Sequence, residues 1–239
     1  MPRLDQALAG RGMVESRSRA QALIMAGRVR VNDATERRPD RTVRDEDELS
    51  VDTTESWASR GALKLAPALD AFELDPEGQV CADIGASTGG FTDLLLRRGA
   101  SRVYAVDVGR GLLDWKLRQD PRVVLMERTN ARDLPPFSEP VTLLTVDVSF
   151  IGLEKILPAL LRSAPGADVV ALYKPQFELP RREVGPGGVV RDEALVERSL
   201  ASFGSWCEAN GYRVLGQAPA GIRGADGNQE HFLHLLPTN

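Results

Sequence analysis

Between residues 80 and 210, short apolar runs alternate with segments of helical periodicity. The apolar runs are Val80–Ile84, Val103–Val106, Val123–Met126, Leu143–Val146 and Val169–Tyr173. The helical segments are Phe91–Arg98, Leu112–Gln119, Leu153–Leu161 and Ala194–Asn210. Apolar runs of this length are typical of buried strands, and their alternation with helices predicts a doubly wound α/β sheet. Ligands of such sheets gather at the C-terminal ends of the strands.

The start of the chain follows a different pattern, with two short helices and a strand. Apolar positions at helical spacing are Leu4, Ala7 and Leu8 in the first helix, which ends at Gly10 or Gly12, and Ala20, Leu23 and Ile24 in the second. Ser16 or Ser18 can cap the second helix, and Gly27 closes it. In the strand that follows, alternation places Arg28 and Arg30 on one face and two valines on the other, before an Asn32-Asp33 turn.

A polar stretch separates these two patterns. Residues 46–59 are rich in acidic and hydroxyl side chains, and Trp57 is a large apolar residue among them. We therefore predict a small α+β domain over residues 1–45, a linker over 46–59, and a large domain over 60–239. Because an exposed linker tryptophan would be unusual, we expect Trp57 to pack across the joint between the two domains.

Charge is unevenly distributed between the two predicted domains. The chain has a net charge of −4, but residues 1–44 carry ten arginines and five acidic residues, a net charge of +5, and the remainder carries −9. A basic arm on an acidic body suggests contacts with phosphate groups, which guanidinium groups bind well. The candidate residues are Arg3, Arg17, Arg19, Arg28 and Arg30. A merely solvated arginine face is the alternative.

Other classes of protein receive little support. We find no apolar run of about 18 residues, and the polar start lacks the apolar core of a secretory signal, which predicts a cytoplasmic protein that does not enter membranes. Cys81 and Cys207 are expected to be buried thiols. No Cys/His cluster has metal-binding spacing, and His231 and His234, in an apolar terminal segment, are expected to be structural.

A glycine-rich turn follows the first strand of the large domain. It reads Asp83-Ile-Gly-Ala-Ser-Thr-Gly-Gly-Phe91, and Asp107 follows the next strand, 22 positions after Gly85. Glycines permit close backbone approach, and a carboxylate at the second strand end can bind ribose hydroxyls. The spacing departs from Gly-x-Gly-x-x-Gly, which favours S-adenosylmethionine over NAD as the ligand. A tight structural turn is the alternative.

Longer strings resemble one enzyme family. The large domain resembles methyltransferases of the FtsJ type, and with its basic N-terminal domain the chain resembles the TlyA family of ribosomal RNA 2'-O-methyltransferases. Residues 16–32 resemble the RNA-binding domain of the fourth small-subunit ribosomal protein. The strings that carry the resemblance are Ser59-Arg-Gly-Ala-Leu-Lys-Leu65, the turn at residues 83–93, Ala105-Val-Asp-Val-Gly109, Glu127-Arg-Thr-Asn-Ala-Arg132, Asp147-Val-Ser-Phe-Ile151, Lys174-Pro-Gln-Phe-Glu178 and Gly227-Asn-Gln-Glu230.

The resemblance implies a Rossmann-like methyltransferase that uses S-adenosyl-L-methionine and acts on a cytidine ribose in ribosomal RNA. Large-subunit RNA is the expected acceptor, small-subunit RNA is a further one, and no obligate protein partner is implied. The implied cofactor-binding residues are Asp83, Gly85, Ser87, Gly89, Gly90, Phe91, Asp107, Asn130 and Asp147. Asn130 stands where FtsJ-type relatives have an aspartate, and Asp133 is a rival for its place near the adenine.

The resemblance also implies a catalytic set of two lysines and two carboxylates, namely Lys64, Asp147, Lys174 and Glu230. A neutral ribose hydroxyl is a poor nucleophile, so the site must align it and accept its proton. Residues 179–191 are expected to form a flap near this set that orders on RNA, or an ordinary connector. Two alternatives to the enzyme are a non-catalytic RNA-binding protein and a haemolysin-type membrane-active protein, a name that some relatives carry.

Overall fold

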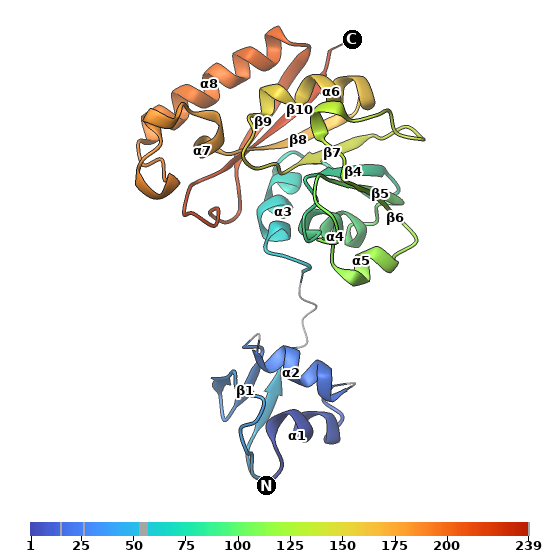
Figure 1. The fold of residues 1–239 in the computed structure, drawn as a ribbon, viewed down its shortest axis with the longest axis vertical. Coiled ribbons are helices and arrows are strands. Elements are labelled where there is room, and N and C mark those ends of the chain that lie inside the picture. Colours follow the sequence, from blue (N-terminus) through green and yellow to red (C-terminus); the bar gives the residue numbers. More distant parts are fainter. Residues whose placement is uncertain (15, 26, 53–56, 239) are drawn as a thin grey trace. The chain divides into compact units, whose positions relative to one another are not determined.

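The computed structural model describes residues 1–14, 16–25, 27–52 and 57–238 (Figure 1). Its internal contacts divide the chain into two compact units, Met1–Ser56 and Trp57–Asn239, called here the N-terminal and C-terminal domains. Among the described residues, no helix is long and apolar enough to span a membrane.

The N-terminal domain packs two helices and a small antiparallel sheet around one core. Its elements are α1 (Leu4–Gly10), α2 (Arg17–Met25), β1 (Val29–Val31), β2 (Ala34–Glu36) and β3 (Leu49–Val51), with the strand order β2-β1-β3. The Ser16 hydroxyl accepts a hydrogen bond from the backbone N–H of Arg19, at 3.2 Å, so of the two predicted caps Ser16 is the one used. Val29 and Val31 are buried and Arg30 is exposed, which confirms the predicted alternation.

The small sheet extends into the segment that was predicted to be a linker. β3 pairs with β1 through Val29↔Val51 and Val31↔Leu49, so the predicted boundary at residue 45 falls inside this domain. A strand of three residues is too short to be recognised from sequence periodicity. β3 is also defined by its pairing with β1, a tertiary contact that the local sequence does not encode. Residues 53–56 of the predicted linker lie outside the described residues. Trp57 packs on the core of the C-terminal domain, with the Arg97 guanidinium 4.5 Å above its ring.

The C-terminal domain is built on one seven-stranded sheet, and the predicted doubly wound α/β fold is confirmed. The strand order is β6-β5-β4-β7-β8-β10-β9, with β10 antiparallel to both β8 and β9 and the other pairs parallel. The strands are β4 (Val80–Ile84), β5 (Arg102–Asp107), β6 (Val123–Glu127), β7 (Leu143–Val146), β8 (Asp168–Tyr173), β9 (Tyr212–Pro219) and β10 (His231–Pro237).

Helices cover both faces of this sheet (Figure 1). α3 (Gly61–Ala71), α4 (Gly90–Arg97) and α5 (Trp115–Gln119) pack apolar side chains on one face, and α6 (Leu157–Ser163) and α8 (Glu193–Ala209) pack theirs on the other. The remaining elements are α7 (Pro175–Glu178) and four 3-10 turns, Ala131–Asp133, Leu153–Lys155, Arg181–Glu183 and Pro186–Gly188.

Two predicted helices are shorter than expected. The helix predicted from residue 112 begins at Trp115, because the Asp114 side chain caps it by accepting a hydrogen bond from the backbone N–H of Lys116 at 2.8 Å. The helix predicted over 153–161 is divided into a 3-10 turn and α6, which has Pro158 in its first turn, where a proline needs no N–H partner.

The two cysteines and His234 play the packing roles expected of them, whereas His231 lines a cavity. Cys81 and Cys207 are free thiols and both are buried. His234 Nε2 lies 2.6 Å from Asp168 Oδ1, and its ring packs against Phe72. Within the described part of the chain, no group of His, Cys, Asp and Glu side chains could hold a metal ion.

Candidate active site

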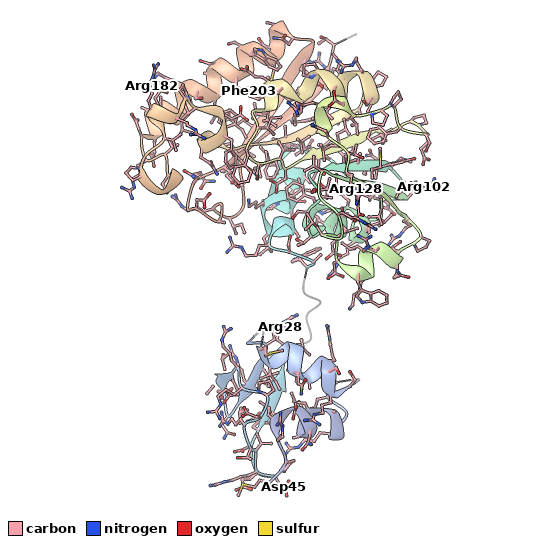
Figure 2. The ribbon with its side chains drawn as sticks, viewed as in Figure 1. Arg28, Asp45, Arg102, Arg128, Arg182 and Phe203 are labelled. Atoms are coloured by element: carbon pink, nitrogen blue, oxygen red, sulfur yellow. The ribbon has the colours of Figure 1, made fainter. Side chains whose placement is uncertain are left out.

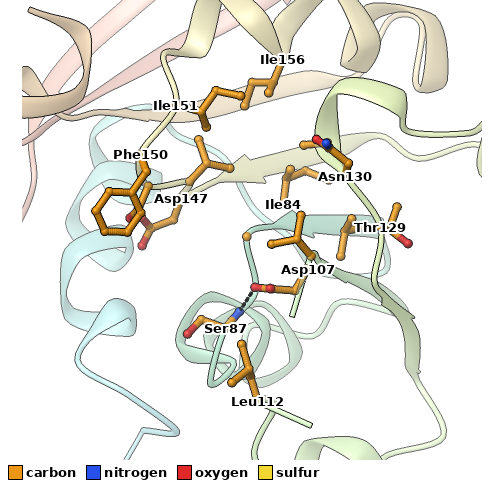
Figure 3. A pocket seen from close by; sticks show the side chains of 16 residues that line it. Ile84, Ser87, Asp107, Leu112, Thr129, Asn130, Asp147, Phe150, Ile151 and Ile156 are labelled. Carbon is orange, nitrogen blue, oxygen red and sulfur yellow. Dashed lines mark hydrogen bonds between the residues drawn. The ribbon is translucent and has the colours of Figure 1, made fainter. Parts of the chain in front are cut away.

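The candidate site lies where the order of the strands reverses, at the carboxyl ends of β4 and β7. β4 is flanked by β5 on one side and β7 on the other, which opens a crevice between their C-terminal ends. A pocket of about 320 Å³ lies there (Figure 3). Its polar wall includes Gly85, Ser87, Asp107, Asn130 and Asp147, and its apolar wall includes Ile84, Leu112, Ile151 and Ile156.

The glycine turn after β4 is shaped by close backbone contacts. Gly85 has φ +89°, and a Cβ atom there would lie 2.3 Å from the backbone oxygen of Asp147. The position therefore excludes a side chain, and the backbone itself forms the pocket wall. Asp107 holds the turn in place, because its carboxylate accepts a hydrogen bond from the backbone N–H of Ser87 at 2.8 Å (Figure 3). It accepts a second one from the backbone N–H of Gly109 at 2.7 Å. A carboxylate has about four acceptor positions, so two remain for ribose hydroxyls.

Asp83 is the most deeply buried carboxyl of the site. Its side chain is 1% exposed, and Oδ2 accepts hydrogen bonds from the Thr92 backbone N–H at 2.9 Å and from the Thr92 hydroxyl at 2.7 Å. Oδ1 has no hydrogen-bond partner among the described residues. Burial raises the pKa of Asp83 to about 7, and the nearby Asp147 carboxylate contributes in the same direction. A buried acceptor without a partner fits a hydrogen-bond donor of a bound ligand.

A second cavity of about 360 Å³ adjoins the first. Among the residues predicted to bind the cofactor, Asp83, Gly90 and Phe91 line this cavity, and Gly85, Ser87 and Asp147 line both. The second cavity also contains Lys64, so it connects the cofactor-type pocket with one of the predicted catalytic residues.

Two predictions about this wall have different outcomes. Gly89 lines neither cavity; its φ is +94°, and a Cβ atom there would lie 2.3 Å from Leu117, so backbone conformation and packing explain the glycine. Asn130 lies in the wall of the first pocket, and its side chain accepts a hydrogen bond from the Arg132 backbone N–H at 3.1 Å. The rival Asp133 does not line that pocket.

The four predicted catalytic residues form two ion pairs. Lys174 Nζ lies 2.5 Å from Asp147 Oδ1, and Lys64 Nζ lies 2.7 Å from Glu230 Oε2. Lys174 and Glu230 are buried, at 6% and 2% exposure. Lys174 also donates a hydrogen bond to the Ser149 hydroxyl at 3.0 Å, a contact that the sequence did not indicate.

Strand topology brings the two pairs to one place. Asp147 directly follows β7 and Lys174 directly follows β8, and these are neighbouring parallel strands. β10 runs antiparallel to β8 with His231 opposite Tyr173, so Glu230 enters the sheet beside Lys174. Asp147 and Lys64 line the same cavity. The arrangement provides two cations and two carboxylates at the edge of the cofactor-type pocket.

The loop before β10 is built around the Lys64–Glu230 pair. The Gly221 N–H donates to the Lys64 backbone oxygen at 3.3 Å, and a Cβ at Gly224 would lie 2.6 Å from Glu230 Oε1. Asn228, which is 1% exposed, ties the predicted flap to this loop: its Oδ1 accepts from the Val190 N–H and its Nδ2 donates to the Gly188 oxygen, each at 2.8 Å. Sequence reasoning missed the role of Asn228, although it lies in the Gly-Asn-Gln-Glu string.

The arginines of the N-terminal domain differ in how they are held. Arg3 and Arg17 both contact the buried Asp5, at 3.1 and 3.0 Å. Burial alone would raise the pKa of Asp5, but hydrogen bonds from Arg3, Gln21 and Arg17 hold it well below its usual range. Arg28 pairs with Asp52 at 3.3 Å. Arg30 is exposed and Arg19 is half-buried, and within the described ranges neither forms an ion pair.

Comparison with known proteins identifies the family. Residues 57–236 match the FtsJ-like methyltransferase family, and residues 2–49 match the S4 domain family. The chain is 47% identical over 238 residues to the 16S/23S rRNA (cytidine-2'-O)-methyltransferase TlyA of Mycobacterium tuberculosis, covering 98% of this chain and 89% of that protein. The chain belongs to the TlyA family of FtsJ-like methyltransferases.

Proteins with haemolysin names belong to the same family. Hemolysin A of Brachyspira hyodysenteriae is 40% identical, covering 98% of this chain and 99% of that protein. The structure of a haemolysin-named protein from Streptococcus thermophilus matches with a TM-score of 0.76 and 42% identity, covering 100% of this chain and 89% of that one. Because such names occur within a methyltransferase family, they do not favour the membrane-active alternative.

Proposed function

We propose that this chain transfers a methyl group from S-adenosyl-L-methionine to the 2'-hydroxyl of a cytidine in large-subunit ribosomal RNA, with small-subunit RNA as a further acceptor. The observation that carries the proposal is the pair of lysine–carboxylate contacts, Lys174–Asp147 and Lys64–Glu230, each with one buried partner, beside the pocket formed after β4. The activity printed for the Mycobacterium tuberculosis relative supports the same reaction. Ribosomal subunits are the proposed partners and the cytoplasm is the proposed location.

The pocket after β4 suits the cofactor. S-adenosyl-L-methionine, when bound, supplies an electrophilic methyl group on a sulfonium. Asp107 would accept hydrogen bonds from ribose hydroxyls, and Asn130 with the apolar wall would hold the adenine. Asp83 Oδ1, which has no hydrogen-bond partner among the described residues, would accept a hydrogen bond from the cofactor. The Gly85 backbone allows the close approach.

The two ion pairs then act on the acceptor. The ribose 2'-hydroxyl must face the methyl carbon in line with the breaking bond and lose its proton as the new bond forms. Lys174 and Asp147 form the group that orients this oxygen and receives its proton. Lys64 and Glu230 hold the ribose and fix the position of the strand ends. DNA lacks the 2'-hydroxyl, so RNA is the acceptor.

The decisive experiment measures label transfer from radioactive S-adenosyl-L-methionine to isolated large and small ribosomal subunits that lack the modification. Wild type is expected to form 2'-O-methylcytidine, identified by mass. Lys174→Ala should lower kcat by about 100-fold or more, with cofactor affinity changed by less than about threefold because Lys174 lies outside the cofactor pocket. Failure of wild type on both subunits, with cofactor and RNA bound, would sink the catalytic proposal and favour an RNA-binding protein.

A second variant separates two roles of Lys174. An arginine stays protonated at all relevant pH values, so Lys174→Arg can orient a hydroxyl but cannot accept its proton. Loss of activity in Lys174→Arg equal to that in Lys174→Ala assigns proton transfer to the amine. Substantial activity in Lys174→Arg assigns proton acceptance to Asp147 instead. Asp147→Asn should then be less active than Lys174→Arg.

A further inference from the structure

A cavity on the side of β10 that faces α8 takes no part in the proposed reaction. It has a volume of about 680 Å³ and is lined by residues 189–191, α8, Gln217 of β9, loop residues Arg223, Gly227 and Gln229, and His231 at the start of β10. Side chains alternate across a strand, so Glu230 contacts α3 through Lys64 whereas the next residue, His231, lines this cavity with side chains of α8. The cavity therefore lies next to Glu230 along the chain, but on the opposite face of the sheet from the Lys64–Glu230 pair.

The lining combines apolar and hydrogen-bonding groups. Val196 and Leu200 of α8, with Val190, provide apolar surface, and the remaining lining residues are mainly polar. They include Gln217, Gln229, Glu193, Glu197, Arg191 and Arg223. Within the part of the chain that the structure describes, Arg191, Glu193 and Glu197 form no ion pair. Their charges are thus available to a ligand.

The wall nearest the active site is held by hydrogen bonds. Asn228 fixes the backbone of residues 188 and 190, and the Gln229 amide donates to the Glu230 backbone oxygen at 3.0 Å. Arg223 donates to the Gly227 oxygen at 3.0 Å, which leaves further N–H groups of its guanidinium for a ligand. The cavity and the Lys64–Glu230 pair therefore share one loop, residues 221–230.

We propose that this cavity binds one unpaired nucleotide of the substrate RNA, a neighbour of the nucleotide that is methylated. The inference rests on the proposed function, because it takes RNA as the substrate. Apolar surface receives the faces of a base, side-chain amides and carboxylates bind its edge, and guanidinium groups bind phosphate. The volume lies in the usual range for small-ligand sites, about 300–1,000 Å³. Glu193 and Glu197 are acceptors, which favours a base with an exocyclic amine, that is cytosine, adenine or guanine, over uracil.

The first test fills the cavity in the full-length protein. Gln217 is an exposed residue of the lining, so Gln217→Trp occupies the space without removing packed side chains. Leu215→Trp is the matched control, since Leu215 lies on the same strand, is 45% exposed and does not line the cavity. Gln217→Trp should raise KM for ribosomal subunits by about tenfold, in line with the loss of one base contact. kcat and cofactor affinity should stay within about twofold of the control.

A charge pair gives an independent test. Arg191→Ala removes a cation from the lining, and Arg198→Ala removes an exposed cation from α8 outside it. Arg191→Ala should raise KM more than Arg198→Ala does, while both keep the wild-type kcat. Equal KM values for Gln217→Trp and Leu215→Trp, together with equal values for the two arginine variants, would overturn the proposed nucleotide site.

Cross-linking locates the RNA directly. Cys81 and Cys207 are buried, so a photoreactive thiol reagent will label Gln217→Cys at the introduced residue. We expect cross-links to nucleotides next to the methylated cytidine from position 217 and few from the control Leu215→Cys. If wild type methylates neither subunit yet position 217 still cross-links to RNA, the catalytic proposal is wrong and the nucleotide site stands. If methylation proceeds without such cross-links, the site is wrong and the catalytic proposal stands.

Discussion

At the scale of single residues, the buried carboxyl of Asp83 couples the cofactor-type site to pH. Its folded-state pKa of about 7 lies above the ordinary value of 3.8. The folded protein therefore binds this proton more tightly than the unfolded chain does. The resulting stabilisation is fully present below pH 4 and is lost as pH rises to about 7.

Asp83→Asn removes this titration and should change how stability depends on pH. In cofactor-free protein at pH 8, the variant should melt at a higher temperature relative to wild type than it does at pH 4, and the difference should change by about 5 °C or more. Thermal denaturation at both pH values checks this. Other titrating groups such as Glu178, whose pKa burial raises to about 7, are present in both proteins and cancel. A difference that does not depend on pH would contradict the prediction.

Gly224 shows how a single missing side chain can matter to the catalytic set. A Cβ at this position would lie 2.6 Å from Glu230 Oε1, so Gly224→Ala must shift the carboxylate whose other oxygen accepts from Lys64. We expect kcat to fall about tenfold or more, with cofactor affinity unchanged. Gly204→Ala is the control, because its Cβ would meet Val214 at an ordinary 4.0 Å. Wild-type kcat in Gly224→Ala would show that the pair tolerates displacement.

At the scale of elements, burial decides which strands a sequence reveals. β4 and β7 lie in the middle of the sheet with both faces covered, and their mainly apolar runs predicted their bounds without error. β9 lies at the edge of the sheet, where buried and exposed positions are mixed and Arg213, Gln217 and Pro219 interrupt the apolar pattern, so it was not predicted.

The same reasoning applies to the site. Strand-end positions and the family resemblance predicted Asp147, Lys174, Lys64 and Glu230, but their pairing depends on sheet order. Lys64 and Glu230 are 166 positions apart, and their contact exists because β10 returns antiparallel to β8. The cavity beside β10 could not be predicted from the sequence, because its walls come from four separate segments that only the tertiary fold brings together.

Asn228 connects two of these segments, and its removal should loosen one of them. Asn228→Ala deletes both hydrogen bonds to residues 188 and 190, so amide hydrogen exchange in residues 187–190 should become faster by about tenfold. Asn228→Asp keeps the acceptor and should show a smaller increase. Asn210→Ala is the control, since Asn210 bonds locally at the end of α8. Unchanged exchange in Asn228→Ala would mean that other contacts hold the segment.

At the scale of the whole molecule, the distribution of charge is more even than the division at residue 45 suggested. Residues 1–52 contain ten arginines and ten acidic residues, because β3 brings the acidic run Asp45–Glu48 and Asp52 into the N-terminal domain. Residues 1–52 are therefore neutral in sum, and charged residues such as Arg28 and Asp45 lie at opposite ends of the domain (Figure 2). RNA contacts should therefore depend on which arginines are changed, and not on net charge.

The double variant Arg19→Ala/Arg30→Ala tests this arrangement in the full-length protein. Both residues are outside ion pairs among the described side chains, so their charges can neutralise phosphates and release counterions. The slope of log affinity for ribosomal RNA against log salt concentration should become shallower by about 2. Arg38→Ala/Arg44→Ala makes the same change in net charge, but these arginines lie close to Asp40 and Glu46, at 3.7 and 3.8 Å. Equal slopes in the two double variants would show that RNA responds to net charge alone, whereas a shallower slope in Arg19→Ala/Arg30→Ala alone assigns the contact to that face.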